Sequence, residues 1–243
     1  MEIEYEKKTV LITGASSGIG LAIAMTLADS GYEVYGIGRS FDDTKVYPCC
    51  FHCVTCDITD TEALEKCVKE IRRQCRIDVL INNAGCAYYG LHEELNASKI
   101  KKIVRTDLEA PIILTQMLLR DLKVNGGSII NISSVTAISH ANPHGAAYGA
   151  AKAGLYSFTG SIFEEARKHG VRVTAILPDM TDTCLYRNAD FEADDEKGCS
   201  LSSKDIADAV LFVLSRPEGV VIEELVIRPQ LHRIKRKRKN DLH

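Results

Sequence analysis

Short runs of β-branched and other apolar residues alternate along the chain with longer segments whose apolar positions recur every three or four residues. The runs predict strands, because a strand that is buried on both faces is apolar almost throughout. They cover residues 9–13, 34–38, 51–56, 78–81, 127–132, 171–177 and 224–227. The longer segments predict helices, as in residues 61–75, where Leu64, Val68 and Ile71 share one helical face.

The predicted helices follow the strands in turn. The first ends near residue 30, and the others cover residues 61–75, 97–122, 146–169 and 203–215. Pro111 lies inside the third of these helices and predicts a kink there. The alternation as a whole predicts an α/β fold, a doubly wound parallel sheet of about seven strands with helices on both faces. Ligands of such sheets bind beyond the carboxyl ends of the strands.

Length and composition indicate one globular domain. The chain has 243 residues, of which 45% are hydrophobic and 26% charged. We expect residues 1–230 to form a single dinucleotide-binding and catalytic domain. No apolar run is long enough to cross a bilayer, and the acidic N-terminus does not resemble a signal peptide. A cytoplasmic location without membrane partners is the expectation.

Basic residues are concentrated at the C-terminus. Residues 231–243 hold six basic and one acidic residue, a net charge of +5, so the rest carries −8 of the total of −3. We expect this tail to be solvated and disordered, because like-charged runs usually stay unfolded. The acidic body does not predict nucleic-acid binding, although the tail alone could tether the chain to a polyanion or an acidic membrane.

The nine cysteines form an odd set in a chain without a secretion signal, which favours reduced thiols. Cys49, Cys50, Cys53 and Cys56, with His52 among them, raise the alternative of a zinc site. A short run of this kind offers no second arm to complete a tetrahedral site, so we expect buried thiols and no metal.

A glycine-rich turn follows the first predicted strand, in the segment from Thr13 to Gly20. Glycines there let the backbone approach a pyrophosphate, and the next helix offers its positive N-terminus. The spacing differs from G-x-G-x-x-G, and a turn that merely needs positive φ is the simpler alternative. Its place between the first strand and the first helix favours phosphate binding.

Polar residues also follow later strands. Asn82 to Gly85 come after the fourth strand, and Ser133 and Ser134 after the fifth. Tyr148 and Lys152 are four residues apart on the next helix, which places the phenol and the ammonium on one face. A fixed cation lowers the pKa of a nearby tyrosine, as acid–base catalysis requires. A surface pair without function is the alternative.

These motifs together resemble the short-chain dehydrogenase/reductase family, and the resemblance spans essentially the whole chain. The glycine turn matches the T-G-x-x-x-G-x-G motif of the family, Asn82 to Gly85 match N-N-A-G, and Tyr148 with Lys152 matches Y-x-x-x-K. The resemblance implies a Rossmann-type fold and hydride transfer between a nicotinamide cofactor and a ketone or secondary alcohol. It also implies a homodimer or homotetramer.

The resemblance assigns catalytic roles to four positions. Tyr148 would exchange a proton with the substrate oxygen, and Lys152 would lower the pKa of Tyr148 and bind the nicotinamide ribose. Ser134 would hold the substrate oxygen, with Ser133 as the weaker candidate. Ser134 lies fourteen residues before Tyr148, one more than is usual in the family, so we expect a bulge between them. Asp107 stands where the family has asparagine, and its charge would raise the pKa of Tyr148.

The resemblance also assigns the cofactor site. The residues concerned are Gly14, Ser16, Ser17, Gly18, Ile19, Gly20, Arg39, Ser40, Asp57, Ile58, Asn83, Ala84, Gly85, Tyr148, Lys152, Pro178, Thr181 and Thr183. The end of the second strand offers Arg39 and no carboxylate, which favours NADP(H), because arginine accommodates the 2′-phosphate. NAD(H) stays open, since Arg39 could simply stack on adenine. Asp179 replaces a family glycine and leaves the local backbone path open.

The substrate itself stays open. The resemblance implies that residues 184–203 cover it, and this stretch holds Leu185, Tyr186 and Phe191 among five acidic residues. Fold does not select a substrate, because function depends on the site. Asp107, Asp179 and the altered serine spacing support one alternative, a catalytically silent NADP(H)-binding sensor or scaffold.

Overall fold

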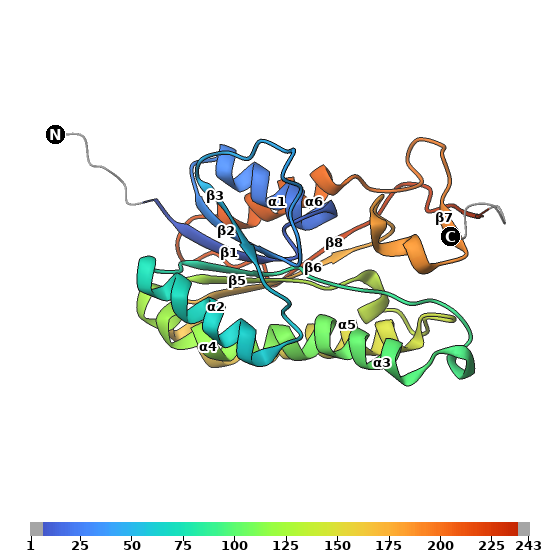
Figure 1. Ribbon diagram of the computed structural model, residues 1–243, viewed down its shortest axis with the longest axis horizontal. Helices are drawn as coiled ribbons and strands as arrows, with labels where there is room; N and C mark the ends of the chain where they lie inside the picture. Colours follow the sequence, from blue (N-terminus) through green and yellow to red (C-terminus); the bar gives the residue numbers. More distant parts are fainter. Residues whose placement is uncertain (1–6, 238–243) are drawn as a thin grey trace.

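The computed structural model describes residues 7–237, which are built around a seven-stranded sheet (Figure 1). Its strand order is β3-β2-β1-β4-β5-β6-β8, and every neighbouring pair is parallel. The strands are β1 (Thr9–Thr13), β2 (Glu33–Gly38), β3 (Phe51–Thr55), β4 (Val79–Asn82), β5 (Ser128–Ile132), β6 (Arg172–Pro178) and β8 (Glu224–Ile227). The predicted doubly wound parallel sheet is confirmed.

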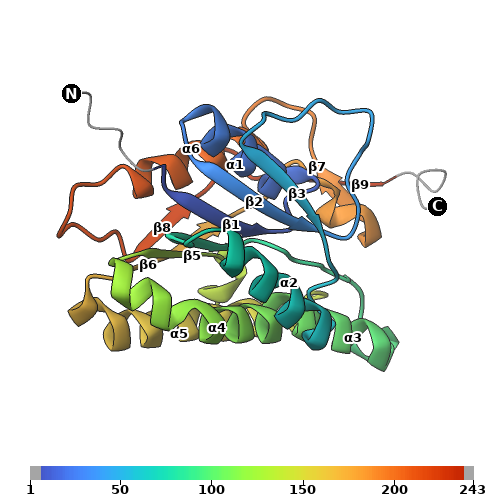
Figure 2. The ribbon, with the colours of Figure 1, turned by 60° about the vertical axis from the view of Figure 1, so that its left-hand side comes forward.

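Helices cover both faces of this sheet. The α-helices are α1 (Gly18–Asp29), α2 (Thr61–Gln74), α3 (Ala97–Val104), α4 (Ala110–Asn125), α5 (Ala146–Ala166) and α6 (Ser203–Leu214). In both ribbon views, α1 and α6 lie on one face, and α2, α4 and α5 lie on the other (Figures 1 and 2). The strand order reverses between β1 and β4, so a ligand cleft is expected beyond these two strands.

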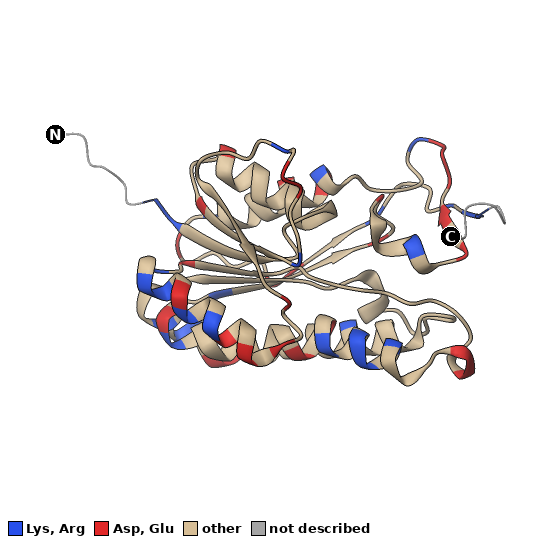
Figure 3. Ribbon diagram, viewed as in Figure 1, with Lys and Arg blue, Asp and Glu red and all other residues tan. Residues whose placement is uncertain are grey.

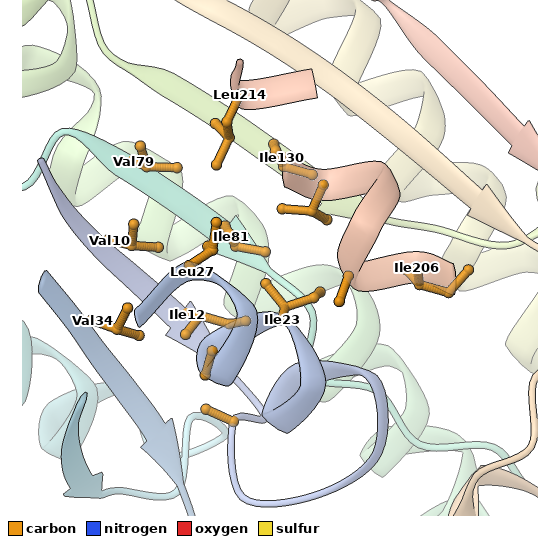
Figure 4. Packing of buried hydrophobic residues seen from close by; sticks show 14 of the residues in the cluster. Val10, Ile12, Ile23, Leu27, Val34, Val79, Ile81, Ile130, Ile206 and Leu214 are labelled. Carbon is orange, nitrogen blue, oxygen red and sulfur yellow. The ribbon is translucent and has the colours of Figure 1, made fainter. Parts of the chain in front are cut away.

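The side chains on the two faces of β1 belong to two separate hydrophobic cores. Val10 and Ile12 pack beneath α1 and α6 with Ile23 and Leu27 (Figure 4), whereas Leu11 faces the opposite layer. Successive side chains of a strand point to opposite faces, and here both faces are fully covered. The apolar runs of the sequence are therefore strands buried on two sides, and their carboxyl ends are rigidly placed.

The long helix predicted for residues 97–122 is divided by a π-helical segment, Arg105–Glu109. Ala110 donates its N–H across five residues to the carbonyl of Arg105. Pro111 follows in the first turn of α4 and has no N–H for the carbonyl four residues before it, which belongs to Asp107. The irregularity expected from Pro111 thus takes the form of a widened turn around Asp107.

The basic C-terminal segment differs from its prediction. β9 (Ile234–Arg236) pairs antiparallel with β7 (Phe191–Ala193) as a separate two-stranded sheet. Two of the segment's basic side chains, Arg233 and Lys235, form ion pairs with acidic side chains of residues 190–196. The expectation of disorder is wrong for residues 231–237, and residues 238–243 lie outside the described residues.

No helix within residues 7–237 is long and apolar enough to cross a membrane.

Candidate active site

A cleft lies at the carboxyl ends of the central strands. Its lining includes every predicted cofactor residue except Ser40. It also includes the catalytic candidates Ser134, Tyr148 and Lys152. Asp107 is not part of the lining but lies directly behind Lys152. The fold therefore gathers residues from six loops, far apart in the sequence, around one cavity.

The glycine turn forms the floor of this cleft. Gly14 and Gly18 have φ values of 69° and 55°, a region that favours glycine. A Cβ on Gly14 would lie 2.8 Å from the Cα of Ala84, so the turn also requires glycine for close packing. Ser17 caps α1 without a side-chain hydrogen bond, which leaves the first N–H groups of the helix available to an anion. This floor fits a pyrophosphate.

Asn83 ties this turn to the end of β4. Its Nδ2 donates to the carbonyl oxygen of Thr13 at 2.9 Å, and its backbone N–H donates to the Thr13 hydroxyl at 3.1 Å. Asn83 therefore helps to hold the glycine turn in its conformation, and it also lines the cleft.

Charged residues line the end of the cleft that follows β2 and β3. Asp57 accepts hydrogen bonds from the backbone N–H and the hydroxyl of Thr59, at 3.0 and 2.8 Å. The backbone bond from Thr59 is the largest cause of a lowered pKa for Asp57, and the charges of Arg39 and Lys102 lower it further. Arg39 is exposed at the cleft and forms no ion pair with another described residue. It is therefore available to a ligand phosphate.

The catalytic candidates lie at the other end. Tyr148 and Lys152 are 4% and 3% exposed, and the Lys152 Nζ lies 5.8 Å from the Tyr148 ring centroid. That Nζ donates to the carbonyl oxygen of Ile132 at 2.9 Å and lies 3.2 Å from Asp107 Oδ1. An ammonium has three N–H donors, so at least one remains for the cleft.

Asp107 is fully buried and faces Lys152 from the π-helical segment. Its Oδ2 accepts the backbone N–H of Cys86 at 2.9 Å, and its Oδ1 has no other described partner than Lys152. Burial raises the pKa of Asp107, while the charge of Lys152 and the Cys86 bond oppose that rise. A Cβ on Gly85 would lie 2.9 Å from Asp107 Oδ1, so this glycine makes room for the ion pair.

The pKa of Tyr148 differs from the sequence-based expectation. Burial raises this pKa well above its ordinary value, and the neighbouring Tyr89, Tyr186 and Asp107 raise it further, while a hydrogen bond with Ser134 lowers it. The net direction is opposite to the expected one, because burial is the largest cause of the shift. The separate lowering effect of Lys152 stays a prediction. The expected raising effect of Asp107 has the correct direction.

The two serines after β5 have different surroundings. The Ser133 hydroxyl donates to the backbone carbonyl of Lys152 at 3.0 Å and so braces α5. Ser134 Oγ accepts the Thr136 N–H at 3.2 Å and faces Tyr148. The extended spacing to Tyr148 is taken up by a loop in which His144 adopts a φ of 61°. Ser134 is thus the serine available to a substrate.

Aromatic residues form a wall beside Tyr148. The Tyr89 ring lies 6.1 Å from Tyr148, 5.9 Å from Tyr186 and 5.0 Å from Phe191, measured between centroids. Tyr186 and Phe191 come from the segment that was expected to cover the substrate. Burial raises the pKa of Tyr186 to about 12, so its hydroxyl stays protonated.

Asp179 directly follows β6 and still bonds to β8. Its N–H bonds the carbonyl of Ile227, and its carboxylate pairs with Arg228 at 2.9 Å and with His232 Nδ1 at 3.0 Å. Thr181 and Thr183 both line the cleft after it, and Thr183 Cγ2 lies 3.4 Å from the position of a Cβ on Gly18. The replacement of glycine is accommodated by two partners from the C-terminal segment.

Sequence reasoning missed several residues of the site, chiefly Lys102, Tyr89 and Cys86. Lys102 lines the cleft from α3, where an exposed lysine carries no local signal of function. Tyr89 comes from an irregular loop without periodicity, and Cys86 directly follows the N-N-A-G motif. Only Cys86 could have been found, by extending the motif by one position.

The cysteine run has no metal-site geometry. All nine cysteines are free, and within residues 7–237 no three His, Cys, Asp or Glu side chains gather as a metal site would require. Cys56 lines the cleft instead, and burial raises its pKa.

Comparison with known proteins identifies the family of the chain. The family profile of short chain dehydrogenases matches residues 8–193. The chain is 34% identical to serine 3-dehydrogenase of Agrobacterium fabrum over 233 residues, which cover 91% of this chain and 93% of that protein. The chain therefore belongs to the short chain dehydrogenase family of oxidoreductases.

Two solved structures illustrate the likeness. An alcohol dehydrogenase from the archaeon Thermococcus sibiricus, complexed with 5-hydroxy-NADP, has 27% identity and a TM-score of 0.83, covering 94% of this chain and 99% of that one. The 3-ketoacyl-(acyl-carrier-protein) reductase from Brucella melitensis, complexed with NADH, has 25% identity and a TM-score of 0.76, covering 91% and 97%. Structural neighbours thus bind either NADP or NADH.

Proposed function

We propose that this protein transfers a hydride between NADP(H) and a ketone or secondary alcohol, with Tyr148 as its acid–base residue. The observation that carries the proposal is the buried group of Ser134, Tyr148 and Lys152 at one end of a cleft whose floor fits a pyrophosphate. Their spacing and burial match what proton transfer beside a bound dinucleotide requires.

The chain's own residues have separable tasks in this reaction. Ser134 holds the substrate oxygen, and Tyr148 donates a proton to it during reduction or removes one during oxidation. Lys152 would bind the ribose of the cofactor with a donor left free toward the cleft, while Ile132 and Asp107 hold its Nζ in place. The nicotinamide, when bound, supplies or accepts the hydride.

The raised pKa of Tyr148 determines which protonation state of the phenol is available to the reaction. A phenol with a pKa well above its ordinary value is protonated near neutral pH, so it is ready to donate. The protonated phenol is the form that serves carbonyl reduction. Alcohol oxidation then requires more alkaline conditions, because it begins from the phenolate.

Preference for NADP(H) rests on Arg39. Its guanidinium has no ion-pair partner among the described residues and can form two parallel bonds to a 2′-phosphate. Lys102 adds a second positive charge near Asp57. NAD(H) binding stays the alternative, since neighbours of both kinds exist.

The relatives support a substrate with a CH–OH or C=O group. Serine 3-dehydrogenase and alcohol dehydrogenase are named for oxidation of hydroxyl groups, and the reductase of Brucella melitensis for reduction of a ketone. The homodimer or homotetramer implied by the family resemblance stays a prediction, which analytical ultracentrifugation of the purified chain can test.

A two-part experiment tests the proposed function. Fluorescence titration with NADPH and NADH measures binding, and the loss of reduced-nicotinamide absorbance with a panel of ketones measures turnover. Tight NADPH binding with turnover is the expected result. Binding without turnover on any ketone would favour the silent sensor or scaffold, and failure to bind either nucleotide would overturn the cofactor assignment.

A further inference from the structure

The C-terminal segment Arg228–Lys237, here called the strap, crosses over the segment Cys184–Glu196, here called the cover. β9 of the strap pairs antiparallel with β7 of the cover, with Lys235 opposite Glu192. Backbone hydrogen bonds also connect the strap and the cover beyond each end of this pairing. Lys237 N–H donates to the Asp190 carbonyl at 2.9 Å, and Asp194 N–H to the Arg233 carbonyl at 3.0 Å.

Charge complementarity reinforces the pairing. Arg233 lies 2.6 Å from Glu196, and Lys235 pairs with both Asp195 and Glu192. Figure 3 shows acidic and basic residues side by side at this end of the molecule. Arg233 and Lys235 are therefore directed at the cover of the same chain.

The cover in turn reaches the proposed acid–base residue. The Lys237 ammonium donates to the Tyr186 carbonyl oxygen at 2.7 Å. Tyr186 and Phe191 pack on Tyr89, whose ring lies 6.1 Å from Tyr148. A continuous set of contacts therefore connects the strap to the wall beside Tyr148.

The beginning of the strap, residues 228–232 and here called its root, is fixed at the cleft itself. Asp179 lines the cleft, its side chain is 5% exposed, and it pairs with Arg228 and His232. Because the root is held by a buried carboxylate and the far end only by surface contacts, opening would begin at the β7–β9 pair.

The contacts of the β7–β9 pair are weak enough to open. Each strand has three residues, and an isolated two-stranded ribbon is only marginally stable. Exposed ion pairs contribute little individually and are screened by salt. The strap therefore biases the cover toward the closed position without locking it.

We propose that the strap is a positioning element for the substrate side of the site, which holds the cover and its aromatic wall closed over Tyr148. Arg233 and Lys235 act through the cover and touch neither substrate nor cofactor. The proposal rests on the proposed function for its kinetic part. It assigns the basic C-terminus to control of substrate binding, whereas the glycine turn that forms the cofactor floor contains no residue of the strap or the cover.

Charge reversal at the Arg233–Glu196 pair tests this directly. Arg233→Glu and Glu196→Arg should each raise the KM for the ketone about two- to fivefold, the effect of one exposed ion pair, and leave NADPH affinity unchanged. The double variant should return the KM to that of the unmodified chain, because it restores the attraction with the signs exchanged. Lys204→Glu, which reverses one partner of an exposed pair on α6, is the control and should change neither quantity.

Hydrogen exchange gives a readout that does not need turnover. Residues 190–196 and 231–237 should exchange faster together in each single variant and return to slow exchange in the double variant. Salt should have the same effect as a single variant. Unchanged exchange in both singles, or faster exchange without any change in ketone KM, would overturn the proposal. If no ketone were turned over, the proposed function would fail, and coupled exchange restored by the double variant would still support the strap.

Discussion

Asp107 Oδ1 lies 3.2 Å from the Nζ of Lys152, and both side chains are buried. The contact places a carboxylate behind the lysine that the family resemblance assigns to lowering the pKa of Tyr148. At the phenol the two charges act in opposite directions, because a cation favours the phenolate and an anion disfavours it. The pKa of Tyr148 is accordingly governed by burial, which raises it, and the charge of Asp107 adds to that rise.

Asp107→Asn should shift the pH dependence of turnover toward lower pH. Removing the carboxylate charge removes one cause of the raised pKa of Tyr148 and frees the Lys152 charge to lower it further. The rate of oxidation rises as pH rises through this pKa, and the rate of reduction falls there. Both pH–rate profiles should therefore shift to lower pH. Full pH–rate profiles in both directions measure the shift. Asp208→Asn at an exposed ion pair is the control, and an unchanged profile in Asp107→Asn would contradict the account.

Gly85→Ala should destabilise the protein by about 1–3 kcal/mol, the usual cost of forcing a methyl group into a packed site. The new Cβ would lie 2.9 Å from Asp107 Oδ1 and 3.6 Å from Lys152 Nζ, so the ion pair must move. Activity should fall with stability. Gly160→Ala is the matched control, because nothing lies within 4 Å of that position in the interior of α5.

The control has its own expected outcome. Alanine has the higher helix propensity, so Gly160→Ala should stabilise the protein by about 0.5–1 kcal/mol and keep full activity. Urea denaturation of both variants measures the two changes. Equal stability of Gly85→Ala and the unmodified chain would show that the Asp107–Lys152 contact is loosely packed.

Arg39→Ser should weaken NADPH binding roughly ten- to a hundredfold, because hydrogen bonds to charged groups contribute about 1.5–3 kcal/mol. NADH binding should change little, since NADH lacks the 2′-phosphate. Lys45→Ser removes an exposed charge from the following loop and should leave both affinities unchanged. Equal losses for NADPH and NADH would mean that Arg39 contacts a part common to both cofactors.

The sequence predicts the sheet and the cleft floor well, because both depend on local patterns. β1 and β6 are rich in β-branched and other apolar residues, and the glycine turn stands directly between β1 and α1. Residues at the carboxyl ends of parallel strands necessarily meet at one edge of the sheet. Tyr148 and Lys152 likewise share a helical face by spacing alone.

Long-range electrostatics account for what the sequence does not predict. β7 and β9 are three-residue strands without apolar periodicity, and Lys235 lies 40 residues after its partner Asp195. Each charged run taken separately resembles a solvated surface. The direct contact of Asp107 with Lys152 also depends on the π-helical turn before Pro111, which aims the carboxylate inward.

The most direct test of the proposed function compares ketone reduction by the unmodified chain, Tyr148→Phe and Tyr156→Phe. Tyr156 is on the same helix and bonds to Glu224 at the surface, so its loss should leave turnover unchanged. Tyr148→Phe should bind NADPH normally and lose roughly a hundred- to ten-thousandfold in kcat, the usual contribution of a general acid. Turnover by Tyr148→Phe at the rate of the unmodified chain would contradict the assignment of Tyr148 as the acid–base residue.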